Sequence, residues 1–552
     1  MASPNTVFSN RRFCQTCILL LLVLCLLGGC KSDTPDTVST GPVASVPTAA
    51  TSQTLSLAYT ATDSLNPYLA KTKTNQELSR LLYDGLILLD SSMNATLRLA
   101  NAVETNGAVV TVSLREAWFS DGSRVTADDV IASYQAALQG EYLSYQTDFQ
   151  NVKEVTATPK GEVQFTLTFE DPYFENFLDF PVFKKGTENQ QNTDNKTLPP
   201  IGCGRYIFHE ESGAYWLSAN TNWWGGTVAT ARIDLLTLPD DDAIYHGVQV
   251  GTVKWYYSDL KNNSLPGGAT LLSKQVALQN LVYVGCNAQS NLVGDPKLRM
   301  ALSYAIHRQA IAETAYYGSA IAAKGMYPEG LKSVSGLQSL ETQSNKEKAL
   351  EWLEKAGYNK VNEQGYRVNG KQILSLRIIY NEENAARVSM ATLLASQLGE
   401  IGCNVTLEAL SFTAYQNAIQ KGYYDLYIGE MRIPDNLSLY PFITAGGVIG
   451  GQDPEKEDKE EKEDKKQETD DSSQEGEQPP QEEEIVSAED AAYRYHVGQG
   501  SLSEMVSCFN EQLPVIPVCH RTGMLLYSGS IVGTPTPVAD DPFYGIEKCT
   551  IQ

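Results

Sequence analysis

Apolar positions recur along the chain with two periods, which indicates a protein of mixed helices and strands. Residues 55–59 alternate apolar with small or polar side chains, as on a half-buried strand. Further on, Leu78, Leu81 and Leu82 fall on one face of a helix. That helix should end at Gly85 and lead into a short strand.

The segment VTADDVIASYQAAL carries a complete signal for the start of a helix. Thr126 is placed to cap the helix, and Asp129 three residues later completes a capping box. Val130, Tyr134 and Leu138 then recur every four residues on one face. The following segment, VKEVTATPKGEVQFTLTF, predicts a hairpin whose turn lies at its Lys-Gly dipeptide.

Between residues 286 and 450, helical and strand patterns alternate as in an α/β lobe. We expect one long helix over 295–317, with Pro296 near its first turn, where a missing N–H costs nothing. Further helices are expected over 345–358 and 386–402, with strands between them. Near the C-terminus, VIPVCH predicts an apolar strand without a local partner, which should return to pair with the first half of the chain.

The N-terminus has the layout of a bacterial export signal. Its apolar run, Ile18 to Leu27, has ten residues, fewer than the roughly 18 needed to span a membrane. Arginines precede the run, and LGGC, ending at Cys30, resembles a lipobox in which the thiol receives a lipid. We expect a signal peptide over 1–29 and a disordered Ser/Thr/Pro-rich tether over 30–53. The alternative is an ordinary signal peptide with a chance cysteine.

The net charge of −24 is concentrated in one segment. Residues 453–484 hold 16 acidic residues and 5 lysines, a net charge of −11, and no apolar side chain. Such a composition stays solvated, so residues 453–485 are expected to be a disordered surface insertion. An acidic bait for cations or basic partners is the alternative. No basic patch with interleaved aromatics occurs, which argues against nucleic-acid binding.

Cysteine and histidine patterns predict neither a metal site nor a cofactor. Six cysteines remain after removal of the leader and lipidation of Cys30, without CxxC or Cys/His spacing, and the five histidines are scattered. Within the C-terminal segment, Cys519 and Cys549 are the favoured disulfide pair, with free buried thiols as the alternative. No Gly-x-Ser-x-Gly or HExxH motif occurs, so we do not expect an enzyme.

An ordered series of motifs resembles the family 5 solute-binding proteins of ABC importers, which include oligopeptide, dipeptide and nickel-chelate receptors. The longest, LREAWFSDGSRVTADDVIASYQAAL, is similar to the family signature along its whole length. The others, in family order, are YDGL (83–86), GCGRY (202–206), NWWGG (222–226), DPKLRMALSYAIHRQAI (295–311) and LPVIPVCH (513–520).

The resemblance implies an α/β, two-lobed periplasmic-binding-protein-like fold of the large cluster C type. Lobe I would comprise residues 54–285, with an extra subdomain at about 85–180, and a C-terminal return over 515–552. Lobe II would span residues 286–514. Two lobes joined by two crossovers would close on a ligand bound between them.

The function implied is that of a lipid-anchored, extracytoplasmic receptor, most simply for peptides, that delivers its ligand to an ABC permease and ATPase complex. It would be a monomer held by lipid on the outer face of the plasma membrane, or in the periplasm if an outer membrane exists. Two alternatives stay open. One is a receptor for a non-peptide solute such as a metal chelate or glycan. The other is a sensory or adhesive surface lipoprotein on the same fold.

Peptide receptors of this family place an acid opposite the ligand's α-ammonium, in a segment that here is DLYIGEMRIPDNLSLYPF. The family's tryptophan is missing and the acid position falls on Pro434. Glu430 or Asp435 could replace that acid, or Arg432 could bind an anionic group; alternatively, Glu430 and Arg432 pair with each other. The loop at 66–68 is expected at the cleft mouth. The predicted ligand-binding residues are Asn66, Pro67, Tyr68, Tyr427, Glu430, Met431, Arg432 and Asp435.

Overall fold

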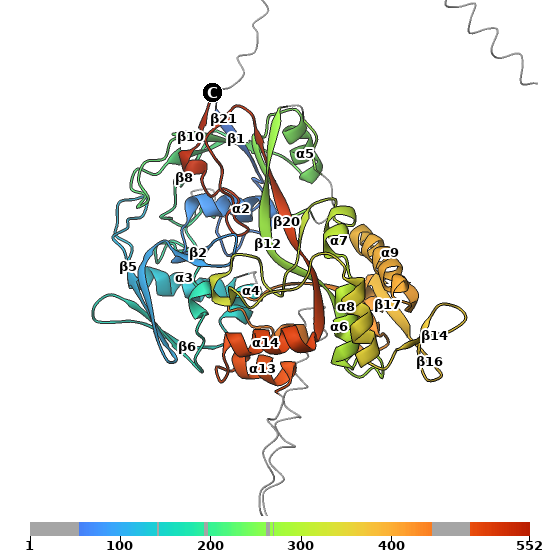
Figure 1. Ribbon diagram of the computed structural model, residues 1–552. Coiled ribbons are helices and arrows are strands. Elements are labelled where there is room, and N and C mark those ends of the chain that lie inside the picture. Colours follow the sequence, from blue (N-terminus) through green and yellow to red (C-terminus); the bar gives the residue numbers. More distant parts are fainter. Residues whose placement is uncertain (1–53, 141–142, 192–196, 261–264, 269, 444–485) are drawn as a thin grey trace, which may run out of the picture. The chain divides into compact units, whose positions relative to one another are not determined.

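A seven-stranded mixed sheet runs through the centre of the computed structural model (Figure 1). The structure describes residues 54–140, 143–191, 197–260, 265–268, 270–443 and 486–552, so the predicted signal peptide, Cys30, tether and acidic insertion lie outside the described residues. The sheet's strands, in spatial order, are β11 (Trp255–Ser258), β20 (Val515–Ser528), β12 (Leu271–Cys286), β19 (Leu426–Arg432), β17 (Ser375–Asn381) and β18 (Asn404–Leu410), with β13 (Ala320–Ala322) paired to β20.

Two unusually long strands, β12 with 16 residues and β20 with 14, form the middle of this sheet. They are antiparallel, with Leu272 opposite Tyr527 at one end and Val284 opposite Ile516 at the other. At one end β20 also pairs with β11, whereas at the other β12 pairs with β19. The prediction that the C-terminal strand returns to the first half of the chain is therefore confirmed.

Helices pack in two apolar cores against the part of the sheet formed by β17, β18 and β19. They are α6 (Pro296–Ala305), α7 (Arg308–Thr314), α8 (Lys346–Lys355), α9 (Ala385–Glu400), α10 (Phe412–Gln420), α11 (Tyr440–Ile443), α13 (Ala488–His496), α14 (Leu502–Gln512) and the 3₁₀ turn η2 (Lys332–Val334). The alternating helix and strand pattern is confirmed in this region. A small separate sheet contains β14 (Lys360–Val361), β15 (Arg367–Asn369) and β16 (Gln372–Ile373).

The single long helix expected over 295–317 is wrong, because the chain forms two helices there. Ile306 is extended, and His307 caps the second helix by accepting a hydrogen bond at Nδ1 from the Ala310 N–H, at 3.0 Å. The apolar period continues across the break, since Ile306 and Ile311 are both buried in the same core. Periodicity alone therefore did not reveal the interruption.

The first half of the chain contains two four-stranded sheets. One is β1 (Leu55–Tyr59), β10 (Arg232–Thr237), β9 (Ala214–Ala219) and β8 (Tyr206–Glu211); the other is β4 (Ala100–Asn106), β5 (Val109–Leu114), β7 (Val163–Leu167) and β6 (Val152–Ala157). The expected hairpin is confirmed as β6 and β7.

The remaining described elements lie outside these sheets, in the first half of the chain and in its C-terminal tail. In the first half they are α2 (Lys73–Leu82), α3 (Ala127–Gln139), α4 (Leu143–Asp148), α5 (Asp241–Gln249), β2 (Ile87–Leu89), β3 (Ala95–Leu97) and the 3₁₀ turn η1 (Phe174–Phe177). In the tail they are β21 (Ile531–Val532), β22 (Thr550–Ile551) and the 3₁₀ turn η5 (Ile546–Lys548).

The capping box at the start of α3 is confirmed. The Asp129 carboxylate accepts hydrogen bonds from the Thr126 N–H at 2.9 Å and from the Thr126 hydroxyl at 2.6 Å. Asp129 also accepts a bond from the N–H of Lys185 at 2.9 Å, so the cap ties the helix to a distant loop. Among the described residues, no helix is long and apolar enough to cross a membrane.

The favoured disulfide is wrong, because all six cysteines of the described chain are free. Cys519 lies in β20 within the core that α6 to α9 cover, whereas Cys549 lies in the core beside β1 and β8. The two thiols are near in sequence, but the long strand β20 carries the chain from one core into the other.

A buried arginine fixes the C-terminal tail beside the first half of the chain. The guanidinium of Arg205 is fully buried and contacts the carboxylates of Asp541 at 2.7 Å and Glu547 at 3.2 Å. It also donates to the carbonyl oxygens of Phe543 and Arg80. A buried charge with several partners is costly to disrupt, so this contact holds the loop around Asp541 in place.

Candidate ligand-binding cleft

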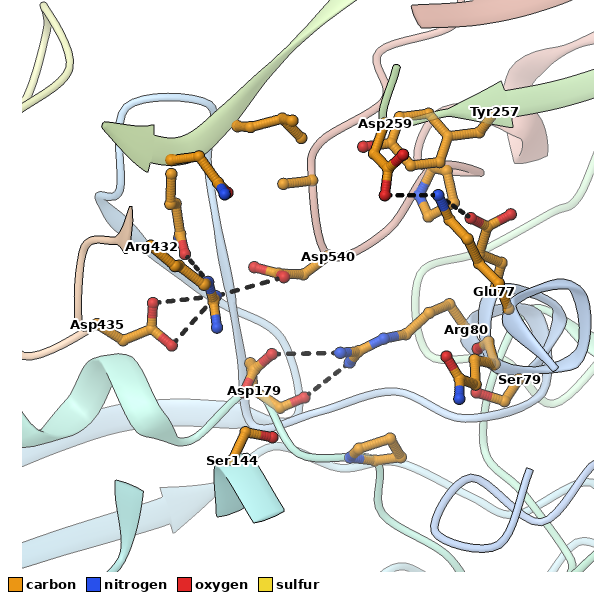
Figure 2. A pocket seen from close by; sticks show the side chains of 18 of the residues that line it. Glu77, Ser79, Arg80, Ser144, Asp179, Tyr257, Asp259, Arg432, Asp435 and Asp540 are labelled. Atoms are coloured by element: carbon orange, nitrogen blue, oxygen red, sulfur yellow. Dashed lines mark hydrogen bonds and ion pairs between the residues drawn. The ribbon is translucent and has the colours of Figure 1, made fainter. Parts of the chain in front are cut away.

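A cavity of about 460 Å³ lies where α2, α4, β12, β19, β20 and the loop 539–542 meet. Its size is within the range of pockets that bind small ligands. The lining is rich in charge, with carboxylates and cations facing one another across it (Figure 2). The charged residues that line it are Lys73, Glu77, Arg80, Asp148, Asp179, Asp259, Arg432, Asp435, Arg521 and Asp540.

Arg432, the last residue of β19, lies among carboxylates on one side of this cavity (Figure 2). Its Nη2 is 3.1 Å from Asp435 Oδ1 and 3.5 Å from Asp540 Oδ1, and its Nε donates to Gln279 at 2.7 Å. Burial raises the pKa of Asp435, and the surrounding carboxylates raise it further, against the opposing effect of Arg432. The cavity therefore holds more acid groups here than one guanidinium can neutralise.

Arg80, on α2, forms a second pair with Asp179. Its Nη1 donates to the backbone carbonyl of Asp179 at 3.0 Å, and Nη2 lies 3.3 Å from the Asp179 carboxylate (Figure 2). Burial raises the pKa of Asp179, because Arg80 offsets only part of the cost of removing the carboxylate from water. The pair joins α2 to the segment that follows η1.

Two further carboxylates in the cavity are poorly compensated. Within the described part of the chain, the carboxylate of Asp148 has neither a hydrogen bond nor an ion pair, and burial near Asp179 and Asp540 raises its pKa to about 7. Burial likewise raises the pKa of Glu77 to about 8. The cation nearest to Glu77, the Lys73 ammonium, lies 3.8 Å away, whereas it is 3.2 Å from Asp259. A cationic group that enters the cavity would find ready partners.

Three of the residues predicted from the sequence line this cavity: Pro67, Arg432 and Asp435. Glu430 does not itself line it, but contacts Arg521, which does, at 3.1 Å. The alternative pairing of Glu430 with Arg432 is wrong. In β19 they alternate with Met431, and each faces a different partner, Arg521 for Glu430 and Asp435 for Arg432.

The other predicted residues serve the fold around the cavity. Asn66 is buried, accepting a hydrogen bond from the Tyr68 N–H at 3.0 Å, and the Tyr68 hydroxyl donates to the carbonyl of Pro181. Tyr427 and Met431 belong to an apolar cluster beside β12, where the rings of Tyr427 and Tyr283 meet edge to face. Tyr427 is therefore a core-packing residue in the structure and does not line the cavity.

Sequence reasoning missed several of the charged residues in the cavity. Arg80, Asp148, Asp179 and Asp540 come from separate segments, and each has the local pattern of an ordinary surface charge. One signal was available, since Arg521 follows the closing family motif on an apolar strand, where an arginine is unusual. Among the described residues, no group of three or more His, Cys, Asp or Glu is arranged to hold a metal ion.

Comparison with known proteins agrees with this architecture. The family model "Bacterial extracellular solute-binding proteins, family 5 Middle" matches residues 87–445. The oligopeptide-binding protein AppA of Bacillus subtilis is 26% identical over 61% of this chain and 65% of its own length. The nickel-binding periplasmic protein of Escherichia coli is 24% identical over 62% of this chain and 68% of its own length. The chain thus spans about two thirds of the length of these curated relatives.

A solved structure extends the match to most of the chain. The nickel ABC transporter protein from Bacillus halodurans has a TM-score of 0.68 and 16% sequence identity, with 90% of this chain and 99% of that chain covered. At this identity the likeness speaks for the fold alone, and it confirms the predicted two-lobed α/β class. The extra subdomain and the lobe boundaries stay predictions. The motifs, the fold and the family model agree, and the chain belongs to family 5 of the bacterial extracellular solute-binding proteins.

Proposed function

We propose that this protein is a lipid-anchored, extracytoplasmic receptor that captures peptides and delivers them to the permease of an ABC importer. The observation that carries the proposal is the charged cavity beside the two long strands, in which the Asp148 carboxylate has no partner among the described residues. The match to an oligopeptide-binding relative supports the same ligand class.

A peptide matches the charges of this cavity. Its α-ammonium needs a carboxylate once water is removed, because an unpaired buried charge costs several kcal/mol. Asp148, with Asp435 and Asp540 near it, offers that partner. Arg80 and Arg432 are suited to the carbonyl or carboxylate oxygens of the same ligand, since guanidinium groups donate several hydrogen bonds in a fixed plane.

Closure on the peptide would use the long strands as crossovers. The proposed boundary at 285/286 falls at the end of β12, and the boundary at 514/515 falls at the start of β20. Bending of these strands would move lobe I against lobe II, which is the hinge type of domain closure. The cavity contains residues of both proposed lobes, including Arg80 from lobe I and Arg432 from lobe II.

Two measurements test the peptide proposal. Native mass spectrometry of freshly purified protein should reveal bound peptides, and calorimetric titration should show that a short peptide binds at least tenfold more tightly than its N-acetylated form, because acetylation removes the ammonium. Binding of a glycan or metal chelate in place of any peptide would overturn the proposal, and equal affinity for the acetylated peptide would remove the role given to the carboxylates.

A metal chelate is the second candidate ligand, because one of the relatives is a nickel-binding protein. A chelate with several carboxylates would carry negative charge and would depend on Arg80, Arg432 and Arg521 instead. Thermal shift assays separate the two ligands. A peptide receptor should be stabilised by a peptide mixture and not by nickel with histidine, whereas a chelate receptor should show the reverse.

The lipid anchor rests on Cys30 and its lipobox, which precede the described residues. Replacement of this thiol, as Cys30→Ser, removes the acceptor for the lipid. The variant should move from the membrane fraction to the medium or the soluble periplasmic fraction of a bacterial host. Continued partition of Cys30→Ser into detergent would contradict the anchor and would leave the solute-binding proposal untouched.

A further inference from the structure

A second cavity, of about 370 Å³, adjoins the ligand cleft along α2. The two cavities share a wall formed by Lys73, Glu77, Tyr257 and Asp259. The second cavity is bounded further by β1, β11 and the start of α5. It has the volume for a single long side chain and lies next to the place proposed for the peptide.

Aromatic rings form much of the lining of this second cavity. Tyr245 comes from α5, and Trp255, Tyr256 and Tyr257 come from β11. Trp255 and Tyr257 are buried. Flat rings of this kind pack against the methylene groups of a long side chain and attract a cation over their faces, as Tyr257 already does with the Lys73 ammonium at 5.0 Å.

The charges of this cavity are strongly unbalanced. Four carboxylates, those of Glu77, Asp241, Asp242 and Asp259, line it together with one ammonium, that of Lys73. The Lys73 Nζ atom lies 3.2 Å from the Asp259 carboxylate and 3.8 Å from the Glu77 carboxylate. Within the described part of the chain, neither Asp241 nor Asp242 forms an ion pair.

A second, independent reason to expect a cationic ligand here is the unsatisfied carboxylate of Glu77. Its Oε1 atom is buried and has no hydrogen-bond partner among the described residues, and the Lys73 ammonium at 3.8 Å is too far away to donate one. A buried carboxylate oxygen without a donor is costly, and a positively charged donor from a ligand would satisfy it. Burial raises the pKa of Glu77 to about 8, and a bound cation would favour its ionised form.

We infer that this second cavity is a subsite that receives a lysine or arginine side chain of the bound ligand. This inference rests on the proposed peptide-receptor function and adds the side-chain class that the receptor prefers. The aliphatic stem lies against the rings of β11, and the cationic end lies at Glu77, Asp241 and Asp242. An acidic side chain is excluded by the same carboxylates.

The experiment compares peptides that differ by one charge. Alanine tetrapeptides with lysine or with norleucine at each position in turn are titrated into the purified protein by calorimetry. Norleucine has nearly the same shape without the ammonium. At one position the lysine peptide should bind about tenfold more tightly or better, because hydrogen bonds to charged groups are stronger than neutral ones.

Variants locate the preference in the cavity. The double change Asp241→Asn with Asp242→Asn removes two carboxylates from exposed positions at the start of α5, and it should abolish most of the lysine preference. The matched control, Glu347→Gln with Glu351→Gln, changes the net charge equally on exposed positions of α8 and should retain the preference. A preference that persists in the first variant, or disappears in the control, would overturn the subsite.

Failure of the subsite and failure of the receptor function have different signatures. If lysine and norleucine peptides bind with equal affinity at every position, the protein binds peptides and only the subsite is wrong. If no tetrapeptide of either series binds, the proposed peptide function is wrong and the subsite falls with it. Tighter binding of glutamate peptides than of lysine peptides would contradict the charge argument directly.

Discussion

At the residue scale, the buried carboxylates of the cleft favour binding of a cationic ligand but destabilise the empty protein. Several carboxylates suited to bind a cation are buried in the empty cavity. Burial disfavours their charged form, which raises the pKa values of Asp148, Glu77 and Asp435 and lowers the stability of the ligand-free protein. Asp84 shows the opposite case. Burial alone would raise its pKa, but Arg98 at 2.9 Å, the charge of Arg205 and the indole N–H of Trp223 outweigh burial and lower it.

Asp148→Asn should stabilise the empty protein at neutral pH. The folded pKa of about 7 lies above the unfolded value of about 4, so Asp148 costs stability once the pH exceeds about 4, and the cost grows until about pH 7. The asparagine removes this cost, which we place at about 1 kcal/mol after allowance for solvent screening. Urea unfolding at pH 4.5 and 7.5 measures the free energy of unfolding of both proteins. The gain in stability of Asp148→Asn over the wild type should be larger at pH 7.5.

The control for this prediction is Glu363→Gln, which removes an exposed carboxylate outside both cavities. Its effect should be small and similar at the two pH values. An Asp148→Asn variant that is less stable than the wild type at pH 7.5, or equally affected at both pH values, would contradict the strained carboxylate.

At the element scale, the pairing of β12 with β19 depends on glycines beneath tyrosine rings. Gly429 of β19 lies opposite Tyr283 of β12, and Gly285 of β12 lies opposite Tyr427 of β19. Each ring covers the glycine across from it, and the two rings meet edge to face with their centroids 5.8 Å apart. This exchange lets two large side chains pack at the strand that leads to Arg432.

Gly429→Ala should destabilise the protein by about 1–3 kcal/mol, since overpacking a buried site forces neighbouring side chains from their places. A Cβ at this position would lie 2.5 Å from Cζ of the buried Tyr283 ring. The matched control is Gly399→Ala in α9, where a Cβ meets nothing within 4 Å. That change should stabilise the helix by about 0.4–1 kcal/mol. Denaturant unfolding of both variants should give effects of opposite sign.

At the scale of the whole molecule, nearly half of the net charge comes from the acidic segment that the sequence predicts to be a solvated insertion. Residues 453–484 contribute −11 of the total −24. Surface charges act on a buried ligand only weakly beyond the Debye length of about 8 Å at physiological salt. Charge of this kind bears on solubility and on association with other molecules more than on the fold.

Replacement of residues 444–485 by a short Gly-Ser linker should therefore leave peptide affinity within about threefold of the wild type at physiological salt. Ile443 and Val486, which flank the replaced segment, belong with the same apolar cluster, and this favours retention of the fold. Calorimetric titration of both proteins with one peptide provides the measurement. A loss of affinity of tenfold or more would assign the segment a part in ligand capture.

Local patterns in the sequence determined most of the elements of this protein. Period-two and period-3.6 alternation, the capping box at Thr126 and the turn at Gly161 depend on neighbours a few residues apart, and the structure contains each of them. The ordered motifs gave the family and the two-lobed class. The sequence pattern did not predict the break between two helices at His307, because the apolar period continues through it.

Only the tertiary structure decided the site, because its charges come from segments far apart in the chain. Pro67, Arg432 and Asp435 were predicted from the family resemblance, whereas nothing local marks Asp148 or Asp540 as cavity residues. Pairing is likewise decided in three dimensions: Glu430 contacts Arg521, and Cys519 and Cys549 lie in different cores. Sequence periodicity reports which face of an element is buried, but the long strands β12 and β20 determine which faces meet.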